Sequence, residues 1–128
     1  MNQLQNLLKE VLTGTKHVES AAVIHLKDGV VLAATPGFYL QLQDIQTVID
    51  AFKNPRMTRT EGLYFQDKSY KCVRADEKSI YSKNNDHGLV IVKTISYLIA
   101  ATYREGMYPS VCVEAVEKLG DYFKEKGK

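Results

Sequence analysis

Apolar residues recur at helical spacing in three stretches of the chain, residues 1–12, 42–52 and 109–126. In each stretch they lie three or four positions apart, which predicts an amphipathic helix with one buried face. At the first helix, Asn2 has a side chain suited to the N-cap, and Gly14 is suited to stop the helix at its C-terminal end.

Between the first two helices, two short apolar runs rich in alanine, valine and isoleucine predict strands, and from Gly62 the hydrophobic period falls to two, which predicts more. Seven strands are expected, over residues 20–26, 30–34, 62–66, 69–75, 79–82, 89–94 and 96–103. The pair Asp28-Gly29 favours a hairpin between the first two strands, with a positive φ at both turn residues. Pro55 is expected to end the middle helix, because the residue before a proline avoids the α region.

The fourth predicted strand shows polar and apolar residues on both of its faces. Strict alternation gives one face with Tyr70, Cys72 and Arg74, and another with Lys71 and Val73. A tyrosine beside an arginine is more typical of a contact surface than of a core.

The order of elements is helix, two strands, helix, five strands, helix. Strands joined by short turns form an antiparallel sheet, and three amphipathic helices can cover its faces. A chain of 128 residues fits one domain. The sequence therefore predicts a single α+β domain over residues 1–128, built on a central antiparallel sheet of about seven strands.

Charge is unevenly distributed along the chain. The net charge of +2 is too small to indicate a nucleic-acid partner. Residues 53–74, however, hold two carboxylates and six cations, namely Lys53, Arg56, Arg59, Lys68, Lys71 and Arg74. Such a segment attracts phosphates or an acidic protein surface, and a solvated basic loop is the plain alternative.

The sequence also bears on the cellular compartment. The longest strongly apolar stretch without charge, residues 94–103, is half the length of about 20 residues that a membrane-spanning helix needs. The N-terminus lacks the basic and apolar regions of a signal peptide. Cys72 and Cys112 show no paired spacing. We therefore expect a cytoplasmic protein with reduced cysteines.

Signatures of catalysis are scarce. The chain has no phosphate-binding glycine loop, zinc-protease helix or nucleophile elbow. His17, His25 and His87 lie far apart and have no cysteine or carboxylate at metal-ligand spacing. The sequence favours a binding protein over an enzyme, with no cofactor and no metal.

Several runs resemble the profilin family across essentially the whole chain. They lie at residues 20–24 with the hairpin that follows, and at 36–38, 61–63 and 119–122. Longer runs, at 14–18, 59–64, 72–76 and 105–115, are most similar to the divergent, testis-associated vertebrate type of that family. The resemblance implies a central antiparallel sheet with both terminal helices on one face and a further helix on the other. It also implies a place in the spermatid cytoskeleton.

Profilins generally bind monomeric actin, proline-rich segments and acidic phospholipids. For actin the family uses one face of the later strands and the start of the final helix, which gives the candidates Arg74, Lys93, Tyr108, Ser110 and Val113. In many profilins the helix start has glycine, glutamine and asparagine where this chain has serine and valine. These changes remove polar partners and add bulk, so we expect actin binding to be weak or absent.

Proline-rich ligands in the family stack on aromatic side chains from both terminal helices and the second strand. The corresponding positions here include Gln3, Asn6 and Leu32, and only Tyr122 matches. We expect weak or no binding of proline-rich segments.

Phospholipid binding requires charge more than shape. Lys53, Arg56, Arg59, Lys71 and Arg74 are the candidates for peripheral binding of phosphoinositides or phosphatidic acid, provided that they share a face. Each lysine or arginine near an anionic surface contributes about 1 kcal/mol, and salt screens the attraction.

Two alternatives stay open at this point. One is a conventional profilin that binds actin monomers and regulates actin polymerisation. The other is a scaffold of the roadblock or longin kind, which shares the hairpin and often dimerises. The extra strands after Gly62 and the Leu-Gly-Asp-Tyr run near the end favour a profilin, and we expect a monomer.

Overall fold

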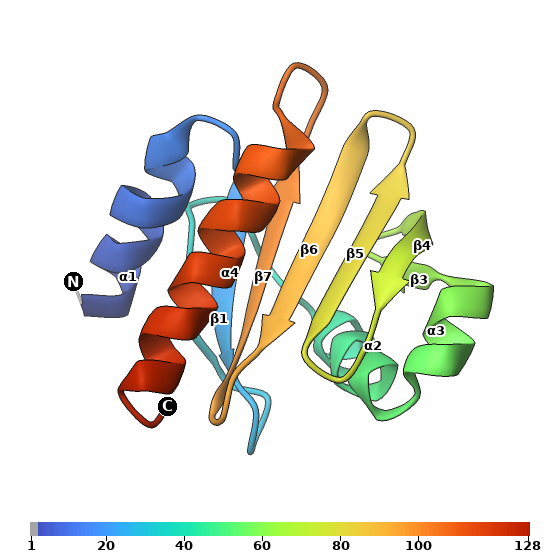
Figure 1. The fold of residues 1–128 in the computed structure, drawn as a ribbon, viewed down its shortest axis with the longest axis horizontal. Helices are drawn as coiled ribbons and strands as arrows, with labels where there is room; N and C mark the ends of the chain where they lie inside the picture. The colour runs from blue at the N-terminus through green and yellow to red at the C-terminus, as the bar shows by residue number, and fades with distance from the viewer. Residues whose placement is uncertain (1–2) are drawn as a thin grey trace.

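The computed structural model describes residues 3–128, in which seven antiparallel strands form one sheet. Their spatial order is β2-β1-β7-β6-β5-β4-β3 (Figure 1). The strands are β1 Ser20–His25, β2 Val31–Ala34, β3 Leu63–Phe65, β4 Lys68–Ala75, β5 Ser79–Asn84, β6 His87–Lys93 and β7 Tyr97–Tyr103. The predicted α+β class and strand number are confirmed.

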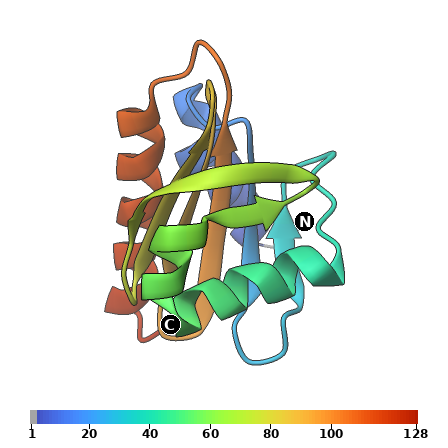
Figure 2. The ribbon, with the colours of Figure 1, turned by 90° about the vertical axis from the view of Figure 1, so that its right-hand side faces the viewer.

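Helices cover both faces of this sheet. The N-terminal helix consists of α1 Gln3–Leu7, the π-helical segment η1 Leu8–Leu12 and the 3-10 turn η2 Thr13–Thr15. It lies beside α4 Pro109–Glu125 on one face (Figure 1). The opposite face carries α2 Leu42–Lys53 and α3 Pro55–Glu61 (Figure 2). The terminal helices therefore share one face, as the family resemblance implies.

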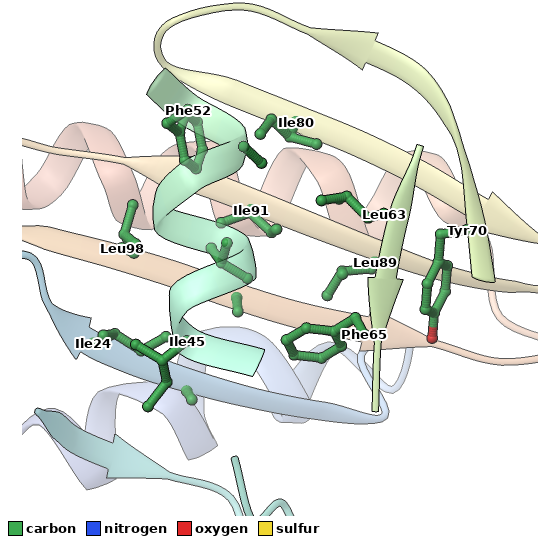
Figure 3. Close-up of a cluster of buried hydrophobic side chains, with 14 of the residues drawn as sticks. Ile24, Ile45, Phe52, Leu63, Phe65, Tyr70, Ile80, Leu89, Ile91 and Leu98 are labelled. Atoms are coloured by element: carbon green, nitrogen blue, oxygen red, sulfur yellow. The ribbon is translucent and has the colours of Figure 1, made fainter. Parts of the chain in front are cut away.

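The central strands contribute to two hydrophobic cores, because successive side chains point to opposite faces. On β7, Leu98 belongs to the core beneath α2, whereas Ile99 belongs to the core beneath α4. Ile91 and Val92 of β6 divide in the same way. Figure 3 shows the first core, in which Phe52 of α2 lies against the strands.

The short helix α3 begins at Pro55, where the sequence predicted only the end of a helix. Asn54 caps it by accepting a hydrogen bond from the Met57 N–H at 3.1 Å. Pro55 fits the first turn, because the missing N–H would have no partner there. The buried hydroxyl of Thr58 donates to the Ala51 carbonyl at 3.0 Å, which joins α3 to α2.

The first helix does not stop at Gly14. The 3-10 turn includes Gly14, and the helix ends at Lys16, which has a left-handed φ of 69°. Gly14 has a different role, because a Cβ at this position would lie 2.9 Å from the Lys9 carbonyl oxygen. The predicted N-cap, Asn2, lies outside the described residues.

The hairpin between β1 and β2 forms, but its turn differs from the prediction. Gly29 has a positive φ of 72° and Asp28 does not, and the Gly29 N–H donates to the carbonyl of His25 at 2.8 Å. The conformation expected there occurs between β3 and β4 instead, where Gln66 and Asp67 have φ values of 48° and 63°.

The predicted faces of β4 are wrong beyond Cys72. The pairing of β4 with β5 is irregular between Cys72 and Arg74, and this bulge shifts the alternation by one residue. Tyr70 and Ala75 therefore both belong to the core beneath α2. Arg74 lies on the other face, with its guanidinium 5.5 Å from the centre of the Tyr81 ring.

Candidate functional site

Six cations and three carboxylates line one depression of about 730 Å³. It lies where the end of α2, α3, the β4–β5 turn and α4 meet. The cations are Lys53, Arg56, Arg59, Arg74, Lys78 and Lys124, and the carboxylates are Asp76, Glu77 and Glu117. We call this surface the basic depression.

Four of the five residues predicted to bind lipid line the basic depression, and Lys71 does not. Lys53 lies on α2, and Arg74 lies on β4. Arg56 and Arg59 lie on the short helix α3, which connects these two regions. Lys78 and Lys124 were missed, because both lie outside the basic segment 53–74 that the sequence analysis singled out. Only their position in the folded chain shows that they belong to the site.

The two arginines of α3 differ in how they are held. The Arg59 guanidinium donates through Nη1 to the carbonyl of Ala75 at 2.6 Å, which fixes α3 against the end of β4. Arg56 is exposed and forms no ion pair among residues 3–128. A guanidinium has five N–H donors, so both arginines keep donors for an anion.

Arg74 is paired with Asp76 at the edge of the site. Its Nε and Nη2 donate to Oδ2 of Asp76 at 3.2 and 3.0 Å. The other carboxylate oxygen of Asp76 accepts from the backbone N–H groups of Lys78 and Ser79, each at 2.8 Å. Burial alone raises the pKa of Asp76, but these hydrogen bonds and Arg74 outweigh it and lower the pKa. The pair orders the β4–β5 turn and offsets part of the positive charge.

Glu117 connects α4 to the same turn. Its carboxylate accepts hydrogen bonds from the Ser79 hydroxyl at 2.9 Å and from the Tyr81 phenol. Burial, followed by the hydrogen bond and charge of Glu117, raises the pKa of Tyr81 to about 12. Glu117 has no signal in the sequence, because both of its partners lie on β5, more than 30 residues before it.

Three of the predicted actin-contact residues lie at the start of α4. Tyr108 precedes the helix, is exposed, and stacks on His17 with ring centres 5.0 Å apart. Its backbone N–H donates to Nδ1 of His17 at 2.9 Å. Ser110 is exposed and Val113 is half-buried.

The other two actin candidates lie elsewhere. Arg74 belongs to the basic depression, and Lys93 is at the end of β6. Lys93 lies near Lys124, toward the C-terminal end of α4. The five candidates therefore do not form one compact cluster around the helix start.

Tyr122, the residue predicted to match the family pattern for proline-rich ligands, lies on α4. Tyr122 contacts Phe123 edge-on, with ring centres 5.6 Å apart, and the Lys126 ammonium lies 4.9 Å from its ring centre. Gln3 and Asn6 of the N-terminal helix are exposed, and Leu32 of β2 packs against the core beneath α4.

The sequence matches the family model for profilin over residues 2–128. The chain belongs to the profilin family. This profilin is 58% identical to profilin-4 of Bos taurus and 56% identical to profilin-4 of Mus musculus, in each case over 99% of both chains. The family match rules out the roadblock or longin alternative.

Solved structures agree with this assignment. Acanthamoeba castellanii profilin IA superimposes with a TM-score of 0.90 at 33% identity, covering 98% of this chain and 100% of that one. Mouse profilin IIa, solved with a double repeat from the FH1 domain of mDia1, superimposes with a TM-score of 0.80 at 18% identity over 99% and 100% of the chains. The latter shows the shared fold.

Profilins are cytoskeletal proteins without enzymatic activity that bind actin and proline-rich ligands. In residues 3–128 of this profilin, no helix is long and apolar enough to cross a membrane. The same residues contain no cluster of three side chains suited to a metal ion, and both cysteines are free.

Proposed function

We propose that this chain is a divergent profilin that binds acidic phospholipids peripherally through the basic depression. The preferred headgroups are phosphoinositides and phosphatidic acid, because their phosphates are multiply charged. Binding to actin monomers and to proline-rich segments is weak or absent. The protein acts in the cytoplasm, at the contact between cytoskeleton and membrane.

The observation that carries this proposal is the convergence of Lys53, Arg56 and Arg59 with cations from β4, the β4–β5 turn and α4. Six cations face three carboxylates, and Asp76 is already occupied by Arg74 and backbone N–H groups. The site therefore carries an excess of positive charge toward solvent. Exposed cations near an anionic surface contribute about 1 kcal/mol each.

Co-sedimentation with vesicles tests the proposal. Phosphatidylcholine vesicles containing phosphatidylinositol 4,5-bisphosphate or phosphatidic acid are expected to pellet the protein at low salt, and pure phosphatidylcholine vesicles are not. Binding is expected to fall steeply as salt rises, because the Debye length shrinks from about 30 Å at 0.01 M to about 8 Å at 0.15 M ionic strength. Binding that is independent of salt contradicts the proposal.

The second candidate is a conventional profilin that binds actin monomers. The start of α4, where Tyr108 stacks on His17, favours this candidate, because it is exposed and therefore accessible to a protein partner. Ser110 and Val113, however, offer fewer polar partners than the residues common in the family. A fluorescence titration with monomeric actin at physiological salt separates the candidates. Micromolar affinity supports the second, whereas no binding at tens of micromolar supports the first.

A further inference from the structure

A groove of about 840 Å³ separates α2 from the turn between β1 and β2. Figure 2 shows α2 lying across one face of the sheet, with the β1–β2 turn projecting beside it. Three lysines line the groove, Lys27 from the turn, Lys53 from the end of α2 and Lys93 from the end of β6. We call this surface the α2 groove.

Apolar side chains form much of the lining of the α2 groove. Leu26 and Ile49 are half-buried, and Ile45 and Phe52 connect the groove to the core beneath α2. Leu42, in the first turn of α2, is 85% exposed. Leu42 lines the same groove as these side chains, and a contiguous apolar surface rimmed by polar residues marks an interaction site where a single exposed leucine does not.

The charges of the groove are unbalanced. Lys27 and Lys93 form no ion pair among residues 3–128, and Lys53 reaches only the exposed Asp50 at 3.8 Å. Asp28 is the one carboxylate among the lining residues that the structure describes. It already accepts hydrogen bonds from the Val30 N–H at 3.1 Å and contacts Nδ1 of His25 at 3.0 Å.

We propose that the α2 groove docks a short segment of a partner protein in which acidic residues flank leucine, isoleucine or phenylalanine. The apolar side chains enter beside Leu42 and Ile49, and the carboxylates pair with Lys27 and Lys93. Complementary charge of this kind selects partners and speeds their association.

The shape of the surface favours a peptide over a membrane. A bilayer is locally flat and cannot enter a groove between a helix and a projecting turn, whereas a single chain segment can. The 12 residues of α2 span about 18 Å, which an extended segment covers with about six residues.

This inference concerns a different site from the basic depression, although Lys53 lines both. The test therefore uses Lys27→Glu with Lys93→Glu, neither of which lines the basic depression. Matched controls are Lys9→Glu with Lys68→Glu, two exposed lysines outside the groove, and Arg56→Glu with Lys78→Glu in the depression.

The experiment selects random peptides displayed on phage against the intact protein. The peptides are about twelve residues long, twice the length that the groove accommodates. Selected sequences are expected to be enriched in aspartate and glutamate next to large apolar residues. Their affinity should fall at least about tenfold with Lys27→Glu and Lys93→Glu, since each change replaces an attraction by a repulsion. It should stay within about twofold in both control variants.

Three results overturn the proposal. The first is a selection that yields no binding peptide, and the second is a set of peptides without acidic enrichment. The third is binding that the Lys27→Glu and Lys93→Glu variant retains. If that variant instead loses binding to phosphatidylserine vesicles while no peptide is selected, the groove contacts membranes and not a protein segment.

Discussion

The hydroxyl of Ser79, at the start of β5, donates a hydrogen bond to the carboxylate of Glu117 on α4, with 2.9 Å between the oxygens. Tyr81, two residues farther along β5, donates to the same carboxylate. The Arg74 guanidinium lies over the Tyr81 ring. Glu117 therefore connects the C-terminal helix to the strand and turn that carry the basic depression.

Replacing Glu117 by alanine is expected to lower the free energy of unfolding by about 1–3 kcal/mol, because Ser79 and Tyr81 lose their acceptor in a partly buried site. Glu114→Ala is the control on the same helix. Glu114 is exposed, and within residues 3–128 its one ion pair is with Lys118 at 2.8 Å, so its loss should leave stability almost unchanged. Urea unfolding of both variants measures the difference, and equal losses would contradict this role for Glu117.

The same contact predicts a dependence on alkaline pH. Burial and Glu117 raise the pKa of Tyr81 to about 12 in the folded protein, above its ordinary value of 10.0. Folding therefore favours the neutral phenol. Its contribution to stability is complete below about pH 10 and is lost as the pH rises through the folded-state value.

Comparison of the protein with Tyr81→Phe isolates this titration from the other tyrosines. The stability advantage of the unsubstituted protein should shrink between about pH 10 and about pH 12. In the background of Glu117→Ala, the Tyr81 phenolate should appear at lower pH in a spectrophotometric titration. An unshifted titration there would show that Glu117 does not hold the phenol neutral.

The close packing of α4 on β6 depends on Gly120. A Cβ at this position would lie 2.8 Å from Cγ1 of Val92, in the core beneath α4. Gly120→Val is expected to cost about 1–3 kcal/mol, because the extra carbon atoms overpack a filled core. Thermal unfolding checks this value. Asp121→Val, at the exposed neighbour of Gly120, controls for the helix propensity of valine and should cost clearly less.

Binding of proline-rich segments is expected to be weak, since Tyr122 is the only aromatic matching the family pattern. Calorimetric titration with a proline decamer should give a dissociation constant weaker than about 100 µM, or roughly −5.5 kcal/mol. A tighter constant would show that Leu32 and the polar residues of the N-terminal helix do not prevent docking.

The sequence predicted the elements better than the positions of individual side chains. All seven strands and three long amphipathic helices follow from the hydrophobic pattern. Burial on one face imposes a period, whereas β1, β6 and β7, which are buried on both faces, read as short continuous apolar runs. The helix that begins at Pro55 was missed, because its residues are mostly polar and its single buried side chain, Thr58, gives no period. The bulge between Cys72 and Arg74 has no local signal, and it decides on which face Arg74 lies.

The site was predictable to the extent that it is local in sequence. Lys53, Arg56 and Arg59 belong to one basic segment, and the fold places them together. Lys78 and Lys124 join them only through the packing of α4 against the β4–β5 turn, which no short sequence pattern records. Lys71 belongs to the same basic segment but does not line the depression, because closeness in sequence does not fix a shared face on a bulged strand.

The most direct test of the proposed function is vesicle co-sedimentation of the variant with Arg56→Glu and Lys78→Glu. Both side chains are exposed and line the basic depression, and neither side chain is in an ion pair among residues 3–128. Arg59 is left unchanged, because its hydrogen bond to the Ala75 carbonyl fixes α3 against β4 and its loss would disturb the fold.

The control is Lys9→Glu with Lys68→Glu, which changes the net charge by the same amount at positions outside the depression. The account predicts that the first variant loses binding to vesicles with phosphatidylinositol 4,5-bisphosphate and the control keeps most of it. Equal binding by both variants would contradict the assignment of the basic depression as the lipid site.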